Sequence, residues 1–331
     1  MANCELILSG FADEAANEKT IDQQFVAFSS LGLSHLSLRF IDVGWGIKNV
    51  MDLNGDELDL VRTKLDEYDL KISSIGSPIG KTKLLDVTDG TTNTFFDPQE
   101  YLDDHVLRAC KIANTLDCKL LRGFSFYHPK NEDPFQFIEQ SAHRLKEIAE
   151  ACDDHGLTFG LEVEANLVGQ NADILNQIKS AVNHDAVVLI FDGANLVTQG
   201  YSKADIIKQY STMQDGLGWL HIKDHLSTDA TIGKYVDEER LHDFVPAGEG
   251  ESGYPEILVE FKKNFESILA RAKQRGLPGI FADLEPHLRG GGQFGGFSGP
   301  DGFGVAVRSF CNLCDEAGID YQLRDFQSLS S

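Results

Sequence analysis

The sequence lacks an apolar run long enough to cross a membrane, and its first residues, MANCELILSGFADE, are too polar for a secretory signal peptide. Positive charge is also scarce, because 29 lysines and arginines face 52 aspartates and glutamates, which leaves a net charge of −23. A field of this sign repels phosphate backbones and anionic membranes. We therefore expect a cytoplasmic protein that acts on a small molecule and binds neither nucleic acid nor membranes.

The chain has six cysteines, and they lack the even spacing of a disulfide scaffold. Cys311 and Cys314 form a single CxxC within an apparent helix, and the sequence has no second pair to complete a zinc site. We interpret these two thiols as side chains that pack on one face of that helix.

The first candidate strand is not followed by a glycine-rich turn, since residues 10–15 read GFADEA. An open doubly wound sheet that binds a dinucleotide usually has such a turn at this place. A match to G-x-G-x-x-G does occur at Gly290, Gly292 and Gly295, but it follows the last candidate strand. We interpret this match as part of a loop and the open sheet as the second choice of architecture.

Short apolar or alternating runs recur along the chain, and a helix-like stretch follows each of them. The candidate strands are residues 5–9, 35–40, 70–75, 118–123, 157–162, 187–192, 218–223 and 279–284. Amphipathic segments such as 56–68 and 134–152 lie between them, and Asp56 and Asp97 are candidate N-terminal signals of helices. Eight such alternations predict an α/β fold, a (β/α)₈ TIM barrel in which residues 1–331 form a single domain.

Three connections from a strand to the next helix are long, at residues 76–99, 225–253 and 286–300. In a barrel, all three lie over the C-terminal face, where enzymes of this fold place their active sites. We therefore expect the functional residues at the C-terminal ends of the strands.

The last four candidate strands end in acidic residues or histidine, which a packed core does not favour. These residues are Glu162 and Glu164, Asp192, His221, and Asp283 and Glu285. Because side chains two residues apart on a strand share a face, one ligand from each strand can converge on a point. Unpaired carboxylates there would raise one another's pKa values, and a divalent cation would relieve this repulsion. Three carboxylates and one imidazole suit one Mn²⁺ or Mg²⁺ ion and tolerate Co²⁺ or Zn²⁺.

Eight segments in order along the chain resemble the xylose-isomerase-like TIM-barrel superfamily, the sugar phosphate isomerase/epimerase group. They are SGFADEA (9–15), IGSPIGK (75–81), LRGFSFY (121–127), LEVEA (161–165), IFDGANLV (190–197), HIKD (221–224), PAGEG (246–250) and LEPHL (284–288). This group also contains ketose 3-epimerases, inosose-processing enzymes and endonuclease IV. The resemblance implies that four residues bind the metal, namely Glu162, Asp192, His221 and Glu285. It leaves Glu164 as a substrate contact or as a residue behind the ligands.

The chain departs from the closest members of this group at three places. Those members read E-N-E-K after the fifth strand, where this chain has Val163 and Ala165. Ketose 3-epimerases have a histidine where Asn195 stands, and we assign Asn195 to the substrate. They also have a substrate-binding arginine shortly after the seventh-strand histidine, whereas the next arginine here is Arg240. These differences preserve metal chemistry and disfavour a simple free ketose as the substrate.

A metal that chelates a carbonyl and its neighbouring hydroxyl stabilises the enediolate that forms when the carbon between them loses its proton. Glu162 and Glu285 approach from separate sides of the pocket, so one can remove the proton and the other return it on the opposite face. This predicts a metal-dependent isomerase or epimerase of a sugar or polyol ketone. The alternative is a metal-dependent lyase that eliminates the aglycone from a 3-keto-glycoside.

Four basic residues also lie near the ends of strands. Arg39 and Arg122 are candidates for binding a substrate hydroxyl or phosphate, or for a buried ion pair with a barrel acid. Lys81 and Lys223 are candidates for polarising a substrate oxygen, and Lys223 can instead pair with its neighbour Asp224. The sequence does not decide between these alternatives.

Loop residues above the predicted barrel mouth supply further candidates. His128 follows the fourth strand directly, and we assign it as an additional catalytic acid or base, although exposed loop histidines are common. His225 and His287 have the same status. Candidates for a lid or for stacking on a sugar, or for simple loop packing, are Trp45, Phe294, Phe297 and Phe303.

Two other functions fit the predicted fold less well. A DNA-repair endonuclease of the superfamily needs a trinuclear zinc cluster with several more histidines and a basic groove, which the sequence does not offer. A sugar-binding barrel without catalysis does not need the complete metal set. The expected partner is a small carbohydrate, and the sequence leaves open assembly into a homo-oligomer.

Overall fold

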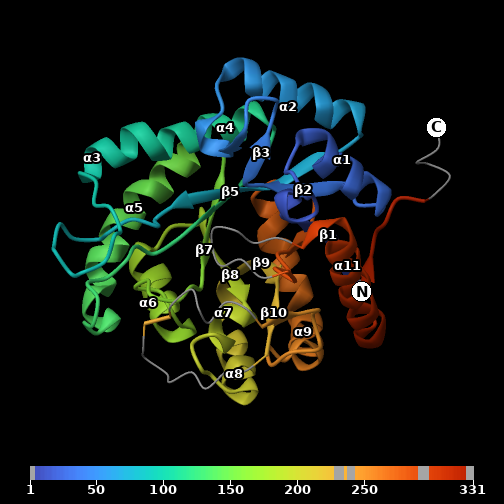
Figure 1. Cartoon of the computed structure of the whole chain (residues 1–331). Coiled ribbons are helices and arrows are strands. Elements are labelled where there is room, and N and C mark those ends of the chain that lie inside the picture. The colour runs from blue at the N-terminus through green and yellow to red at the C-terminus, as the bar shows by residue number, and fades with distance from the viewer. Residues whose placement is uncertain (1–3, 227–234, 237–242, 290–297, 326–331) are drawn as a thin grey trace.

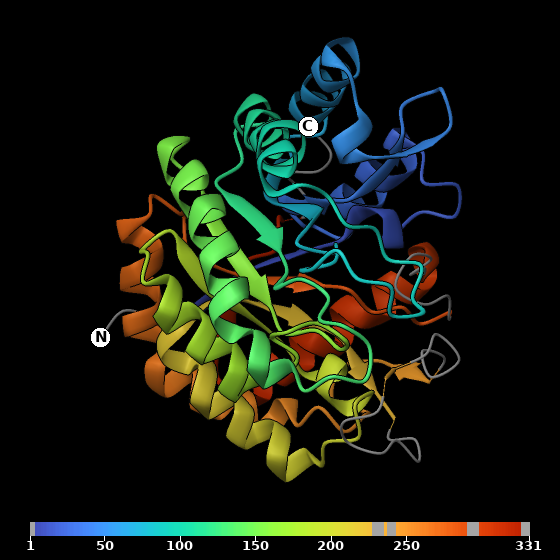
Figure 2. The same cartoon turned by 90° about the vertical axis from the view of Figure 1, so that its left-hand side faces the viewer.

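Eight parallel strands curl into a barrel with helices around its outside, as the sequence predicted (Figures 1 and 2). The strands are β1 (Glu5–Gly10), β2 (His35–Leu38), β5 (Lys71–Ile79), β6 (Leu120–Gly123), β7 (Thr158–Glu162), β8 (Val187–Asp192), β9 (Leu217–Ile222) and β12 (Ile280–Leu284). Hydrogen bonds join them in the order β1-β12-β9-β8-β7-β6-β5-β2, and a parallel bridge between Phe11 and Ser37 connects the two ends. The computed structural model describes residues 4–226, 235–236, 243–289 and 298–325.

Seven of the eight predicted strands agree with the structure to within two residues at each end. The exception is β5, which extends to Ile79 instead of ending at residue 75. This extension exists because Ile79 pairs with Gly123 of the neighbouring strand and accepts a hydrogen bond from the backbone N–H of Phe124. A short strand, β13 (Asp320–Tyr321), adds to β1 outside the barrel order.

The helices lie around the barrel, and short polar side chains cap the first turns of six of those in the described residues. They include α1 (Ile21–Ser30), α2 (Gly55–Glu67), α3 (Pro98–Tyr101), α4 (Leu107–Thr115), α5 (Ile138–Asp154), α6 (Ala172–Val182), α7 (Gly193–Val197), α8 (Lys203–Met213), α9 (Tyr254–Gln274) and α11 (Gly299–Ala317). Asp97 caps α3 as predicted, whereas Asn54 and not Asp56 caps α2, through a capping box with Glu57. The predicted helix 134–152 starts as a separate 3₁₀ turn, Pro134–Phe137, before α5 begins.

Strand pairing and hydrogen bonds fix the long connection after β9 where it lies next to that strand. Two short strands, β10 (Asp224–His225) and β11 (Phe244–Val245), pair antiparallel within it. The Asp224 carboxylate accepts hydrogen bonds from the backbone N–H groups of Gly248, Gly250 and Ser252, at 2.9 to 3.1 Å. These contacts hold the segment after β11 against the end of β9. The glycine match at Gly290, Gly292 and Gly295 and the candidates Phe294 and Phe297 lie outside the described residues.

The interior of the barrel contains a buried acid below its C-terminal mouth. Asp283 of β12 accepts hydrogen bonds from the hydroxyls of Ser73 and Ser74 on β5, both at 3.0 Å. Ser9 donates to Ser73 at 2.6 Å, and Ser37 lies 2.7 Å from Ser74, so hydroxyls from three strands surround this carboxylate. The acid is therefore hydrogen-bonded even though it is fully buried, as such groups usually are.

No helix of the described residues combines the length and the apolar character needed to cross a bilayer.

Candidate metal centre and its charged surroundings

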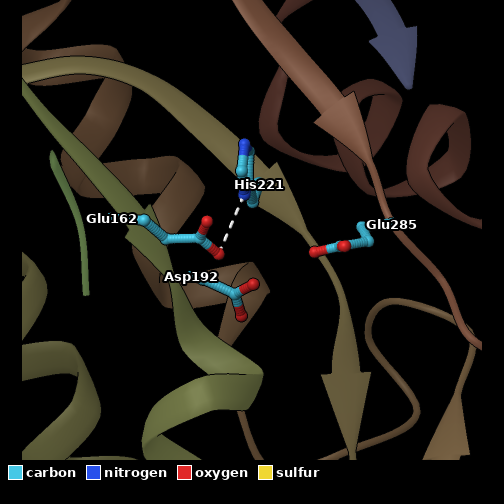
Figure 3. A group of neighbouring side chains, drawn as sticks. All are labelled: Glu162, Asp192, His221 and Glu285. Atoms are coloured by element: carbon cyan, nitrogen blue, oxygen red, sulfur yellow. Dashed lines mark ion pairs between the residues drawn. The ribbon is translucent and has the colours of Figure 1, made fainter. Parts of the chain in front are cut away.

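Four side chains from neighbouring strands converge at the C-terminal mouth of the barrel (Figure 3). Glu162 ends β7, Asp192 ends β8, His221 lies near the end of β9, and Glu285 follows β12. The carboxyl ends of parallel strands meet at one rim, and the register places Asp192 directly opposite His221. One ligand atom from each of the four lies within 4.8 Å of the others, and all four residues are buried. The structure thus brings together the four residues that the sequence assigned to the metal.

The hydrogen bonding of this group fits a cation. Neither ring nitrogen of His221 has a hydrogen bond among the described residues, and the same holds for Oδ2 of Asp192. His221 Nδ1 lies 3.1 Å from Glu162 Oε1, the contact drawn as a dashed line in Figure 3. Buried polar atoms rarely lack a hydrogen-bonding partner, so these atoms are suited to coordinate a bound ion. Three carboxylates and one imidazole could hold a divalent metal ion here.

The charged surroundings separate the pKa values of the carboxyl groups. Burial raises the pKa of Glu162, but the charges of His221 and Arg122 outweigh it and lower this pKa to about 2. Burial raises the pKa of Asp192 to about 6, and the charge of Glu162 adds to this effect, while that of Lys223 opposes it. Glu162 is therefore ionised at neutral pH, whereas Asp192 is the ligand whose negative charge is least stabilised by the protein.

Glu285 is the most heavily paired of the four. Burial raises its pKa, but the cations around it, Lys223 and Arg39 foremost, hold this pKa well below its usual range. Arg39 forms an ion pair with Oε1, and Lys223 lies 3.2 Å from Oε2. Both oxygens of Glu285 thus face a cation before any metal binds.

The two candidate arginines lie at the edge of this group. Arg39 also contacts Asp13 at 3.0 Å and Glu14 at 3.5 Å. Arg122 lies 3.5 Å from Glu162 and 3.9 Å from Glu285. The two arginines therefore form buried ion pairs with acids near the barrel mouth, and two of those acids are candidate metal ligands.

A single aromatic ring supports both arginines. The guanidinium carbons of Arg39 and Arg122 lie 4.5 and 4.9 Å from the centroid of the Phe11 ring. The same ring meets His221 edge to face, with centroids 5.3 Å apart. Gly76 leaves the space for this arrangement, because a Cβ atom there would lie 2.8 Å from the Phe11 ring.

Lys223 lies inside the group of four ligands. Its Nζ atom is 3.0 Å from Asp192 Oδ2 and 3.2 Å from Glu285 Oε2. The suggested pairing of Lys223 with Asp224 is wrong, because the Asp224 carboxylate is occupied by backbone N–H groups of residues 248 to 252. Alternation along the strand explains this: neighbouring residues point to opposite sides.

The remaining candidates for substrate contacts lie beside Glu162. Asn195, in the first turn of α7, donates hydrogen bonds to Glu162 Oε1 at 3.2 Å and to the carbonyl of Val163 at 3.1 Å. Glu164 forms an ion pair with Lys81 at 3.1 Å. Alternation placed Glu164 on the same face as Glu162, but it is not one of the four clustered residues.

The structure does not bring two of the predicted loop residues to the metal centre. His128 Nδ1 lies 2.9 Å from the carbonyl of Pro129, and its ring stacks on Phe137; within the described chain no hydrogen bond or ion pair joins it to the four ligands. It lines a separate cavity of about 470 Å³ together with Asn171 and Tyr201. Phe303 is not a lid residue, because it is fully buried in α11 and packs against Phe28.

Sequence reasoning missed two acids that follow β1. Asp13 and Glu14 are fully buried, and Glu14 Oε1 lies 2.5 Å from Nδ1 of His287, whose Nε2 lies 3.6 Å from Glu285. His287 adopts a left-handed backbone conformation with φ of 50°. The signal for these residues was present, since two consecutive acids in GFADEA directly follow a strand of the barrel. Together, Glu14, Glu285 and His287 form a second group of closely spaced ligand atoms, into which Arg39 already projects.

A family model described as xylose isomerase-like TIM barrel matches residues 27–290. The match covers most of the chain, so the protein belongs to this family. A comparison with curated proteins found no match.

Solved structures show the same fold over nearly the whole chain. A xylose isomerase-like TIM barrel protein from Mycobacterium smegmatis, in complex with magnesium, has a TM-score of 0.63 at 18% identity, with 95% of this chain and 96% of that chain covered. D-psicose 3-epimerase from Clostridium cellulolyticum H10, with D-tagatose, has a TM-score of 0.57 at 15% identity, covering 95% and 96%. The probable 3-DHS dehydratase AsbF from Bacillus anthracis has a TM-score of 0.59 at 15% identity, covering 94% and 99%. At such identities the likeness establishes the fold.

Proposed function

We propose that the protein is a divalent-metal-dependent isomerase or epimerase of a sugar or polyol ketone. The observation that carries this proposal is the convergence of Glu162, Asp192, His221 and Glu285 in a buried group whose ligand atoms lie within 4.8 Å of one another. A bound Mn²⁺ or Mg²⁺ ion would supply a Lewis acid that polarises the carbonyl of the substrate. The epimerase and the magnesium complex among the related structures support this class of chemistry.

The protein's own residues would handle the proton. Glu162 and Glu285 extend from β7 and from the end of β12, which are separated in the sheet by β8 and β9. Their low pKa values keep both carboxylates ionised at neutral pH, the state that a base requires. A substrate held between them would lose a proton to one carboxylate. The other carboxylate would first have to take up a proton from solvent, and would then return it to the substrate on the opposite face. Asn195, through its hydrogen bond to Glu162, would orient that carboxylate.

Basic side chains around the four ligands would bind the substrate's hydroxyl groups. Arg39 and Arg122 are held in place by Phe11, and Lys81 is held by its ion pair with Glu164. These donors suit a small carbohydrate. The net charge of −23 disfavours nucleic acid, and we place the protein in the cytoplasm.

A lyase that eliminates the aglycone from a 3-keto-glycoside is the second candidate. Glu285 favours it, because cations face both of its oxygens and make it a weaker base than Glu162. With one effective acid or base, the same chemistry ends in isomerisation or in elimination. The dehydratase among the related structures is in keeping with this route.

Proton NMR in D₂O would test the proposal. The metal-replete protein would be incubated with a panel of ketoses and 3-keto-glycosides, and a chelated sample would serve as the control. We expect deuterium to enter at the carbon beside the carbonyl only in the metal-replete sample. Release of a second molecule would identify a lyase, whereas the absence of exchange across the panel would contradict both reactions.

A further inference from the structure

Lys223 places a positive charge among the ligands that a metal would use. Its side chain comes from the end of β9, two residues after His221, and only 6% of its surface is exposed. Nζ lies 3.0 Å from Asp192 Oδ2 and 3.2 Å from Glu285 Oε2. The ammonium therefore contacts two of the three carboxylates in the group.

Lys223 and Asp192 form an ion pair that lacks hydrogen-bond geometry. Oδ2 of Asp192 has no hydrogen bond among the described residues, although Nζ lies within ion-pair distance. Oδ1 accepts the backbone N–H of Asn195, so Oδ2 is the oxygen that remains for a cation. An ammonium that neutralises the charge of this oxygen without a well-formed hydrogen bond stabilises it less than a coordinated metal ion would.

An ammonium and a divalent ion cannot both stay close to the same oxygens at low energy. Two like charges about 4 Å apart repel strongly in a buried site, and the effect is doubled when one of them is divalent. The ammonium of Lys223 lies between the carboxylates of Asp192 and Glu285, at 3.0 and 3.2 Å, which is where a bound cation would meet it. It therefore has to move when a metal arrives.

Lys223 has two further neighbours that attract a cation. The ring of Phe244, in β11, has its centroid 5.9 Å from Nζ, a distance at which a cation is attracted to an aromatic face. The carboxylate of Glu164 adds a further negative charge near Lys223.

We propose that Lys223 neutralises the metal position in the metal-free protein and leaves it when a divalent cation binds, so that its ammonium then faces the substrate. This inference rests on the metal centre of the proposed function. It makes Lys223 both an internal competitor of the metal and a residue that becomes available to a substrate oxygen only after the metal is bound.

Titration calorimetry with Mn²⁺ on the metal-stripped protein would test this. We expect Lys223→Met to bind Mn²⁺ at least about tenfold more tightly than the wild type, because the competing charge is gone. The matched control is Lys81→Met, which removes an ammonium paired with Glu164, outside the four ligands, and should change the affinity less than about threefold. Equal or weaker binding by Lys223→Met would overturn the proposal while leaving the metal centre intact. No Mn²⁺ binding by either protein would overturn both.

A second measurement does not depend on the variant's folding. In a crystal structure of the wild-type protein with Mn²⁺ bound, Nζ of Lys223 should lie beyond hydrogen-bond distance of Asp192 Oδ2 and Glu285 Oε2. If Nζ remains at both oxygens beside the metal, the proposal is wrong. The metal-free Lys223→Met protein should also show a lower melting temperature than the wild type, and Mn²⁺ should remove that difference.

Discussion

Asp283 and Glu285 lie two residues apart at the end of β12 and both project into the barrel, yet their surroundings differ. Asp283 accepts hydrogen bonds from the uncharged hydroxyls of Ser73 and Ser74 on β5, and Ser9 of β1 donates to Ser73 behind them. Glu285 is surrounded by the cations Arg39 and Lys223 and by the other candidate ligands. Burial raises the pKa of Asp283, whereas the cations overcome burial and lower the pKa of Glu285.

The comparison distinguishes a structural acid from a functional one. A carboxylate that accepts hydrogen bonds from neutral donors of its own chain has its hydrogen-bonding needs met and gains little from binding a metal. A carboxylate held ionised by cations beside unpaired ligand atoms remains able to bind a metal or accept a proton. Asp283 and Glu285 are one step of strand alternation apart, yet the first lies in the hydrogen-bonded interior of the barrel and the second among the candidate metal ligands.

The largest expected effect is on turnover. In metal-replete protein, Glu285→Gln should lower the rate by about 10² to 10⁴, the usual contribution of a general acid or base. Asp283→Asn, the matched control on the same strand, should reduce the rate far less. Metal content has to be measured in the same samples, because the change also weakens a ligand. Full activity in metal-replete Glu285→Gln would exclude this residue as a base and leave the role to Glu162.

The metal content of the protein should also distinguish the four candidate ligands from Asp283 in the barrel interior. We expect one divalent ion per wild-type chain and nearly none in Asp192→Ala, because this change removes one of the four ligands. Asp283→Ala should retain the ion. Elemental analysis after gel filtration would measure this, and equal metal content in the wild type and Asp192→Ala would contradict the assignment.

Stability should respond in the opposite order. Asp283→Ala leaves the hydroxyls of Ser73 and Ser74 without their acceptor, which should cost about 1–3 kcal/mol of unfolding free energy. Asp192→Ala should cost the metal-free protein less, because the relieved repulsion with Glu162 and Glu285 offsets the lost contacts with Lys223 and the N–H of Asn195. Urea unfolding in the presence of a chelator measures both variants. A larger loss of unfolding free energy in Asp192→Ala would mean that the candidate metal centre also stabilises the fold.

The smallest effect should come from His128. Since its ring contacts Pro129 and Phe137 and no candidate ligand, His128→Ala should lower kcat/KM by less than about threefold, the equivalent of ~0.6 kcal/mol. Steady-state kinetics on the substrate identified by NMR would measure this. A loss approaching that of Glu285→Gln would restore His128 as a catalytic group.

The sequence predicted the fold and the candidate ligands well because both depend on local pattern. Alternating apolar runs located all eight barrel strands. Strand ends supplied six candidate ligands, and the family resemblance selected Glu162, Asp192, His221 and Glu285 among them. Parallel strands in a barrel share one rim, so residues distant in the chain meet without any further information.

What the sequence did not predict depends on contacts between distant segments. The partners of Arg39, Arg122 and Lys223 come from other strands, and the pairing of Lys223 with a sequence neighbour was wrong for this reason. His128 was assigned by its position after a strand, but the path of its loop carries the ring to Phe137. The roles of Asp13 and Glu14 also become visible only once β1 and β12 lie side by side.

The Asp224 carboxylate joins the end of β9 to three backbone N–H groups beyond β11. Gly250 is essential to this junction, since a Cβ atom there would lie 2.4 Å from the carboxylate. The segment between β10 and β11 is therefore inserted between two points that are fastened to each other. The junction itself is made by Asp224 and residues 248 to 252 alone. We therefore expect that changes in length or composition between β10 and β11 leave the end of β9, and with it His221, in place.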